Sequence, residues 1–287
     1  MNFNTRYIKL QFSDVSGSTI VLDGLRCAAV ITNPGGSSAF GNLHLKVYGM
    51  TLEQMNEYSS VGANMVAVQH RTITVSAGNI GSIPSQVFAG TIISSYIDFS
   101  SVPDVCFVCD AVSGYFAQSK EIGPLQLNGQ ANAEDLIQAI AESNGFTFSN
   151  AKAPNNAHFI VQNQYIAGSA IEQMSKIAAL SSFPMVIENN GVFIWSNMGT
   201  RDTVEVDVNP DNGLVGYPSY WAAGFMIKQE FNCNNLVGRI VHLKSTIPKA
   251  NGSWPIQTAT HELSTVTPDG PWFTTSKLSP QPYVANN

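Results

Sequence analysis

The chain has few charged residues. Asp, Glu, Lys and Arg make up 12% of its 287 residues, about half the usual share, whereas apolar residues make up an ordinary 44%. Charged side chains are depleted where protein surface is buried against partners. The composition therefore favours a protein with large subunit contacts, and it leaves open a monomer with a neutral surface.

The sequence also lacks a basic cluster. The formal net charge is −6 and no stretch concentrates Lys and Arg, so the chain has no electrostatic footprint for gripping phosphate groups. We therefore expect no stable binding of nucleic acid. A passage through which nucleic acid slides would tolerate a neutral or acidic wall.

Long hydrophobic runs and an export signal are absent as well. Residues Met1 to Gln11 carry charges and no apolar core of a signal peptide, and no window approaches the length of a membrane span. We expect a chain made in the cytoplasm, without stable membrane binding, whose four cysteines are reduced.

Two of these cysteines form a CxxC pair, Cys106 and Cys109. They lie in a predicted strand from Val102 to Val112, where a separation of three places them on opposite faces. No second CxxC completes a zinc site. The pair is interpreted as structural.

Patterns that carry catalysis are missing. There is no HExxH and no GxSxG, and the Gly35-Gly36-Ser37-Ser38 loop has no Lys for phosphate binding. Glycoside hydrolysis needs two carboxylates across a cleft, and no pair stands out. The acidic candidates are Glu205 and Asp207 on one strand face, with Asp98, Asp104 and Asp110 scattered over turns and strand ends. The five histidines are far apart in sequence: His44, His70, His158, His242 and His261.

A calcium loop is the remaining candidate for a metal site. Asp207, Asn209 and Asp211 follow the opening of the calcium-loop pattern, but the sixth position is Asn212 where Gly belongs and the twelfth is Pro218 where Glu belongs. We therefore predict no catalytic, cofactor-binding or metal-binding residue, no cofactor, and a protein that is not an enzyme.

The middle of the chain predicts a helix followed by a strand, twice over. In the first unit Asn132 caps a helix whose Leu136, Ile137 and Ile140 share one face, and Asn144-Gly145 end it. Phe146 to Phe148 then alternates as a strand.

In the second unit Ser169 and Glu172 form a capping box. Ile171, Met174, Ile177 and Ala178 follow along one stripe. Phe183 and Pro184 end this helix. The strands Met185 to Glu188 and Val192 to Trp195 then flank a predicted Asn190-Gly191 hairpin turn, and His158 to Val161 forms another short strand before the helix.

Both ends of the chain are rich in predicted strands. The ranges before residue 100 are Tyr7 to Phe12, Thr19 to Leu22, Arg26 to Thr32, Leu43 to Tyr48, Met65 to Ser76 and Gln86 to Phe99, with one helix capped by Thr51 and Gln54. The later ranges are Val204 to Val208, Phe225 to Phe231, Arg239 to Ser245 and Trp254 to Leu263. The last twenty residues are predicted as a tail. Trp221, Trp254 and Trp272 fit core packing and subunit contact equally well.

We therefore predict a mainly β fold with an α+β middle domain. Residues 1–116 form a first β-rich domain, 117–199 the middle domain and 200–287 a second β-rich domain, with the option that strand 102–112 pairs with the second.

Three stretches resemble the baseplate hub proteins of contractile-tailed bacteriophages, which are related to the spike proteins of type VI secretion systems. They are residues 43–56 (LHLKVYGMTLEQMN), residues 135–146 (DLIQAIAESNGF) and the run from Val161 through Ile187 to the Asn190-Gly191 hairpin. Gly270-Pro271-Trp272-Phe273 extends the likeness towards the end of the chain. No single motif is specific, but their order is.

The resemblance implies a structural protein of the virion tail baseplate. In that family three copies close into a ring with two tube-like β-barrel or sandwich domains each, joining a sixfold tail tube to a threefold spike. The partners implied are further copies of the chain, a tube or distal tube protein, a central spike protein, other baseplate proteins and DNA in transit. These residues show no likeness to a lysozyme-like domain or a needle extension, so we expect no wall degradation. The alternatives are a spike component of a secretion system or tailocin, and a cell-wall hydrolase or carbohydrate-binding tail protein.

Overall fold

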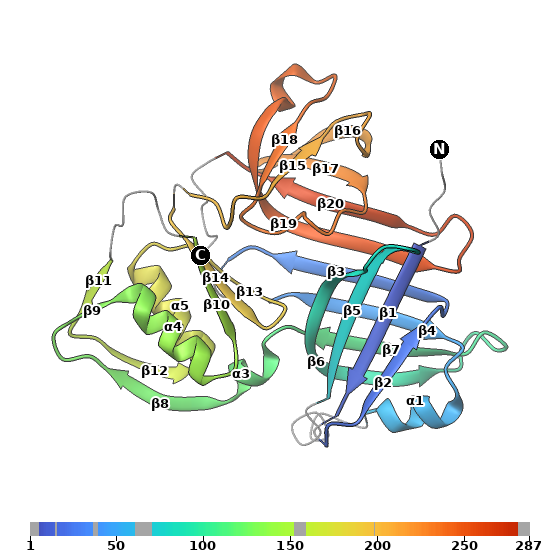
Figure 1. Ribbon diagram of the computed structural model, residues 1–287, viewed down its shortest axis with the longest axis horizontal. Coiled ribbons are helices and arrows are strands. Elements are labelled where there is room, and N and C mark those ends of the chain that lie inside the picture. The colour runs from blue at the N-terminus through green and yellow to red at the C-terminus, as the bar shows by residue number, and fades with distance from the viewer. Residues whose placement is uncertain are drawn as a thin grey trace.

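One large sheet runs through both ends of the chain. The computed structural model describes residues 6–14, 16–36, 40–60, 71–151, 159–197 and 199–280, and the fold is mainly β as predicted (Figure 1). The strands of the 13-stranded sheet follow the order β16 (Leu214–Trp221), β17 (Gly224–Glu230), β20 (Trp272–Leu278), β19 (Gly252–Thr265), β3 (Cys27–Pro34), β4 (Asn42–Tyr48), β7 (Cys106–Val112), β6 (Ser85–Asp98), β5 (Thr72–Asn79), β1 (Arg6–Ser13) and β2 (Thr19–Asp23). The sheet branches at β19, where β18 (Ile240–Leu243) pairs and is joined in turn by β15 (Glu205–Val208).

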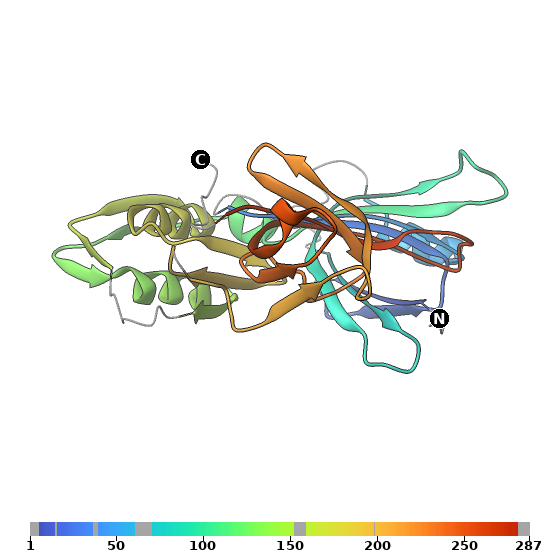
Figure 2. The same ribbon diagram turned by 90° about the horizontal axis from the view of Figure 1, so that it is seen from above.

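The strands form because their apolar residues alternate with polar ones. In β3 the inward Cys27, Ala29 and Ile31 are buried, whereas Ala28 and Val30 are exposed. The inward side chains of β3, β4 and β7 pack against β1, β5 and helix α1 (Leu52–Tyr58) in one apolar core. Figure 2 shows β1 and β2 lying on one side of β3 and β4. This layer covers one face of the sheet and leaves the opposite face open.

Helix α1 begins as its sequence predicts. The Thr51 side chain accepts a hydrogen bond from the Gln54 backbone N–H, and the Gln54 side chain accepts one from the Thr51 N–H. Met55 and Tyr58 are buried, whereas Leu52 points to solvent. The capping box is confirmed, and the apolar face of the helix is narrower than expected.

The middle of the chain folds as a compact module beside the large sheet (Figure 1). Helices α4 (Ala133–Ser143) and α5 (Ala170–Leu180) pack on a three-stranded sheet of β10 (Thr147–Ala151), β14 (Gly191–Trp195) and β13 (Met185–Glu188). Its rim consists of α3 (Tyr115–Ser119) and the short pairs β8 (Glu121–Gln126) with β12 (Tyr165–Ser169) and β9 (Gln130–Asn132) with β11 (Ile160–Gln162). The predicted strand start at His158 lies outside the described residues.

Both helix-to-strand units are confirmed in their capping. Asn132 accepts from the Glu134 N–H, and Ser169 and Glu172 complete a capping box. After α4 the Phe146 N–H donates to the Ala141 carbonyl, and Gly145 adopts φ 81° in the left-handed region. On α4 the buried residues include Ile137 and Ile140, but Leu136 is only partly buried.

The hairpin turn is shifted by one residue from its prediction. Glu188 pairs with Gly191, so the two turn residues are Asn189 and Asn190, with φ of 50° and 61°. Asn tolerates the left-handed region, and this register sets Val192 opposite Ile187 in the core. A turn at Asn190-Gly191 would instead set Asn189 opposite Val192.

The end of the chain departs most from the prediction. The expected tail contains β20, which lies inside the sheet between β17 and β19, and β16 was also not predicted. A 3₁₀ helix, η1 (Pro248–Ala250), precedes β19. Strand β7 pairs with β4 and β6. The sequence left open that strand 102–112 pairs with the last β-rich domain, and the structure does not show that pairing among the residues it describes. None of the helices within the described ranges has the length and apolar character of a membrane span.

Candidate assembly surface

The two β-rich ends are joined by a pair of hydrogen-bonded strands, β3 and β19. Eight residue pairs, from Thr258 with Pro34 to Thr265 with Cys27, hold them antiparallel. We call this pairing the seam. Because of it the strands before residue 113 and those after residue 213 belong to one continuous sheet, in which neither β3 nor β19 is an edge.

Polar residues are buried on the covered side of the seam. His261 of β19 is 1% exposed, and its Nδ1 lies 2.9 Å from the Thr274 hydroxyl of β20. Burial lowers the pKa of His261 to about 4, which keeps the imidazole neutral. Beside it, Asn235 donates a hydrogen bond to the buried Ser276 hydroxyl at 3.0 Å. These two hydrogen bonds tie β20 to β19 and to the segment that contains Asn235. Across the seam itself, the buried Cys27 backbone N–H donates to the Thr265 hydroxyl at 3.3 Å.

A buried ion pair fastens the middle module to the seam. Arg201 donates to one carboxylate oxygen of Glu188 in β13, and Asn33 of β3 donates to the other at 3.1 Å. The Arg201 guanidinium also stacks over the Phe193 ring at 3.7 Å. All three polar residues are at most 5% exposed, so the charges are paired away from water.

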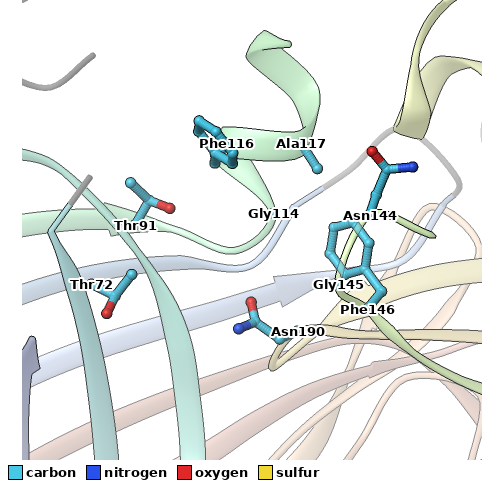
Figure 3. A pocket seen from close by; sticks show the side chains of 9 residues that line it. All are labelled: Thr72, Thr91, Gly114, Phe116, Ala117, Asn144, Gly145, Phe146 and Asn190. Carbon is cyan, nitrogen blue, oxygen red and sulfur yellow. The ribbon is translucent and has the colours of Figure 1, made fainter. Parts of the chain in front are cut away.

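A cavity of about 330 Å³ lies between the large sheet and the middle module. Figure 3 shows Thr72 and Thr91 on the sheet side, Phe116 and Ala117 on α3, and Asn144, Phe146 and Asn190 on the module. The lining offers hydroxyls, amides and aromatic rings. Among the described residues the lining contains no carboxylate, histidine, lysine or cysteine, the side chains commonly used for acid–base catalysis.

The cysteines are free thiols in a packed interior. Cys27, Cys106 and Cys109 are buried, and Cys233 is half-buried. Burial raises the pKa of the Cys27 thiol to about 12, and it raises the pKa of Cys106 and of Cys109 as well. Cys109 belongs to the apolar core, and Cys106 lies on the opposite face of β7 as predicted. Such thiols are poor nucleophiles and metal ligands.

Three of the acidic candidates each pair with one basic side chain at the surface. Asp104 contacts Arg26 at 3.3 Å, and Asp110 contacts His44 at 2.7 Å. Glu205 contacts His242 at 2.8 Å. No group of three or more His, Cys, Asp or Glu residues is placed to hold a metal ion within the described ranges. His70 and His158 lie outside those ranges.

Two side chains of the calcium-like loop form hydrogen bonds within the loop itself. The Asn209 side chain accepts from the Asp211 N–H at 2.9 Å, and the Asn212 side chain donates to the Asp207 carbonyl at 2.8 Å. The Asn209 and Asn212 side chains therefore stabilise the turn.

The three tryptophans of the last segment are partly buried. The indole N–H of Trp221 donates to the Leu278 carbonyl, and that of Trp254 donates to the Ala250 carbonyl. Trp272 packs against the Phe231 ring at 5.2 Å. Each therefore packs within its own chain.

Strand β20 was missed in the sequence because its buried residues are polar, and the seam was missed because it pairs segments far apart in sequence, which no local pattern reveals. Thr274 and Ser276 are fully buried in β20, so the strand shows no hydrophobic alternation. Glu188 and Arg201 are separated along the chain, and no sequence pattern predicts that they form a buried ion pair. The one available signal was the high share of uncharged polar residues.

Comparison with known proteins identifies the family. Residues 35–277 match the family of the baseplate hub gp41. A search of curated proteins by sequence gives no match.

Solved structures share the fold at low identity. A tail protein from Neisseria meningitidis MC58 has a TM-score of 0.64 at 10% identity, with 96% of each chain covered. The 43 kDa tail protein of prophage MuSo2 from Shewanella oneidensis has a TM-score of 0.60 at 10% identity, covering 94% of this chain and 96% of that one.

The Escherichia coli protein c3393 is described as a type VI secretion component similar to the bacteriophage T4 tail proteins gp27 and gp5. It has a TM-score of 0.56 at 9% identity, covering 89% of this chain and 73% of that one. The family match spans most of the chain, and the chain belongs to the baseplate hub family of phage tail proteins.

Proposed function

We propose that this chain is a structural hub of the tail baseplate, a homotrimer that joins the sixfold tail tube to a threefold central spike. The hub surrounds part of the channel through which DNA leaves the virion. Its action is geometric: it presents matching surfaces at its two ends and carries out no reaction.

The seam is the observation that carries this proposal. It places two β-rich units of one chain side by side in a single sheet. The three larger apolar clusters, from residues 8–111 with Leu263, from 133–194 and from 206–278, support two β domains and a middle domain bounded near residues 116 and 200. A smaller fourth cluster of Val186, Trp195 and Val237 joins the middle domain to the last one.

Two β-rich units in each chain allow a threefold ring to match a sixfold tube. A ring of three chains has three equivalent positions, but two similar units per chain present six near-equivalent positions to a sixfold tube. The buried Glu188–Arg201 pair would hold each middle module in one orientation around such a ring. The partners proposed are a tube or distal tube protein, a spike protein and other baseplate proteins.

Ring closure requires a contact surface at the end of the sheet. Strand β16 is an edge strand of the described sheet, and none of its residues is charged. Tyr217 and Tyr220 on it are 74% and 66% exposed. Pro218 and a register shift between Val215 and Ser219 keep this edge from pairing as a regular strand, so its contact surface consists of side chains, and exposed tyrosines are enriched at interfaces. We assign β16 to the contact between copies.

The mass of the purified chain in solution, combined with negative-stain images, tests the proposal. We expect a trimer with an open centre. The variant Y217K/Y220K should remain folded but dissociate, because each new lysine is buried against the neighbouring copy. Leu180→Lys is the matched control, since Leu180 is an exposed apolar residue of the middle module. A dimer, a closed particle without a channel, or dissociation by both variants would contradict the proposal.

A secretion-system or tailocin spike is the second candidate, favoured by the similarity to the type VI component. The two roles share the trimeric architecture and differ in the surrounding genes. Capsid and portal genes beside this one would establish the phage role.

A further inference from the structure

The open face of the sheet continues across the seam. Side chains on this face come from β17, β20, β19, β3, β4, β7 and β6, because residues paired across antiparallel strands point to the same side. One row consists of Lys228, Thr275, Thr260, Thr32 and Asn42. The next consists of Glu230, Phe273, Glu262, Val30, His44 and Asp110. We call this surface the open face.

The basic groups of the open face lie beside carboxylates or aromatic rings of the same chain. Lys228 lies 3.7 Å from Glu262 and over the Phe273 ring at 4.4 Å. His44 contacts Asp110, and Lys277 lies over the Trp221 ring at 5.5 Å.

At the far end of the face, Lys46 lies near enough to Asp98 to help lower the pKa of that carboxyl, after the hydrogen bonds from Ser100. Arg26 lies over the Tyr48 ring at 3.7 Å and contacts Asp104. The basic groups of this surface are thus already engaged within the chain.

Uncharged polar groups fill the space between these pairs. The Thr32 and Thr260 hydroxyls lie 3.4 Å apart across the seam. A hollow of about 350 Å³ opens over β3, β4 and β7 and is lined by Thr32, Asn42, His44 and Asp110 among others. The surface can be wetted, yet it offers no cluster of free cations.

We propose that the open face is the wall of the DNA channel and that its paired charges keep duplex DNA from adhering. This inference rests on the proposed hub. Protein cations bind DNA by replacing the counterions on its phosphates. A lysine already paired with a carboxylate gains little from that exchange, so DNA slides past. The opposite face of the sheet is covered by β1, β5 and α1, which leaves the open face to line the passage.

Removing carboxylates from the open face tests the wall. The variant E230Q/E262Q frees Lys228 and makes the face more positive. Its matched control is E53Q/E57Q, which makes the same chemical changes at exposed positions of α1, on the covered side. Binding of a short fluorescent DNA duplex is measured by anisotropy at low and at physiological salt. The single variants E262Q and E53Q form a second matched pair in case a double variant unfolds.

We expect at least about tenfold tighter DNA binding by E230Q/E262Q than by the wild-type protein, lost as salt is raised. The control E53Q/E57Q should bind as weakly as the wild type. Equal binding by both variants would show that only net charge matters and would overturn the inference, as would no gain in E230Q/E262Q.

The same samples are weighed in solution to separate the two proposals. If the protein is a trimer but E230Q/E262Q and E53Q/E57Q bind DNA equally, the proposed channel wall is contradicted and the proposed hub is not. The absence of trimers would count against the proposed hub. The DNA measurement would still test the open face, because this face is exposed in the single chain.

Discussion

Single residues decide how firmly the parts of this molecule are joined. Glu188, Arg201 and Asn33 come from three different segments and meet in the interior. An ion pair in such a place adds little net stability when intact, but its loss leaves a charge without water or partner. These three side chains therefore help to fix the orientation of the middle module.

We predict that Glu188→Gln lowers the free energy of unfolding by about 3–5 kcal/mol, because Arg201 would keep its charge without a carboxylate. Urea unfolding measures the change. Asp104→Asn is the control: the Arg26–Asp104 pair is exposed, and its loss should change stability by less than about 1 kcal/mol. Similar losses in both variants would contradict the buried junction.

The buried His261 should make the seam sensitive to acid. Its pKa is lowered to about 4 in the folded protein by burial, against about 6.5 in an unfolded chain. The unfolded state thus binds a proton first, and stability present above pH 6.5 declines as the pH falls towards 4. The loss is about 3 kcal/mol.

Unfolding measured against pH for the wild type and His261→Gln checks this. The variant should be less stable at pH 7 but should lose less stability between pH 6.5 and 4. Parallel pH curves for the two proteins would show that His261 is not the group responsible.

At the scale of elements, the sequence predicted the residues that cap the helices, but it predicted only some of the residues that each helix buries. Thr51, Asn132 and Ser169 cap helices as predicted, since capping depends on residues within one turn. The buried stripe of α4 is centred on Ile137, and Leu136 lies at its border. Which residue faces the core is set by α5 and β10, which the sequence of α4 does not contain.

We therefore predict different costs for two neighbouring substitutions on α4. Ile137→Asp places a carboxylate in the fully buried side of the helix and should destabilise the protein by several kcal/mol. Leu136→Asp can turn its carboxylate towards water and should cost clearly less. Thermal unfolding followed by circular dichroism compares them, and an equal or reversed order would contradict the observed helix register.

For the whole molecule, the central fact is that both ends share one sheet. Strand β19 is bonded on one side to β20 and on the other to β3, so β-rich parts far apart in sequence should unfold together. The family match and the solved tail proteins show that this is a hub fold, and the trimer remains a proposal.

Thr260→Pro tests the coupling. Proline removes a ladder hydrogen bond and is disfavoured in central strands, so we expect a loss of about 1–3 kcal/mol from the carbonyl left without its partner. Hydrogen exchange followed by mass spectrometry should show β4 and β20 opening together, while Thr260→Val, which keeps the backbone hydrogen bond, leaves both protected. Faster exchange confined to β20 would show that the two ends are independent.

The sequence alone determined the local features: the helix caps, most strands of the first half, the mainly β class and the absence of a catalytic pattern. These depend on periodicity and on neighbours within a few residues. Only the tertiary structure decided the position of β20, the Glu188–Arg201 pair and the seam. Their buried side chains include Thr, Ser, Asn, His, Glu and Arg, which read as surface residues until partners distant in sequence satisfy their hydrogen bonds.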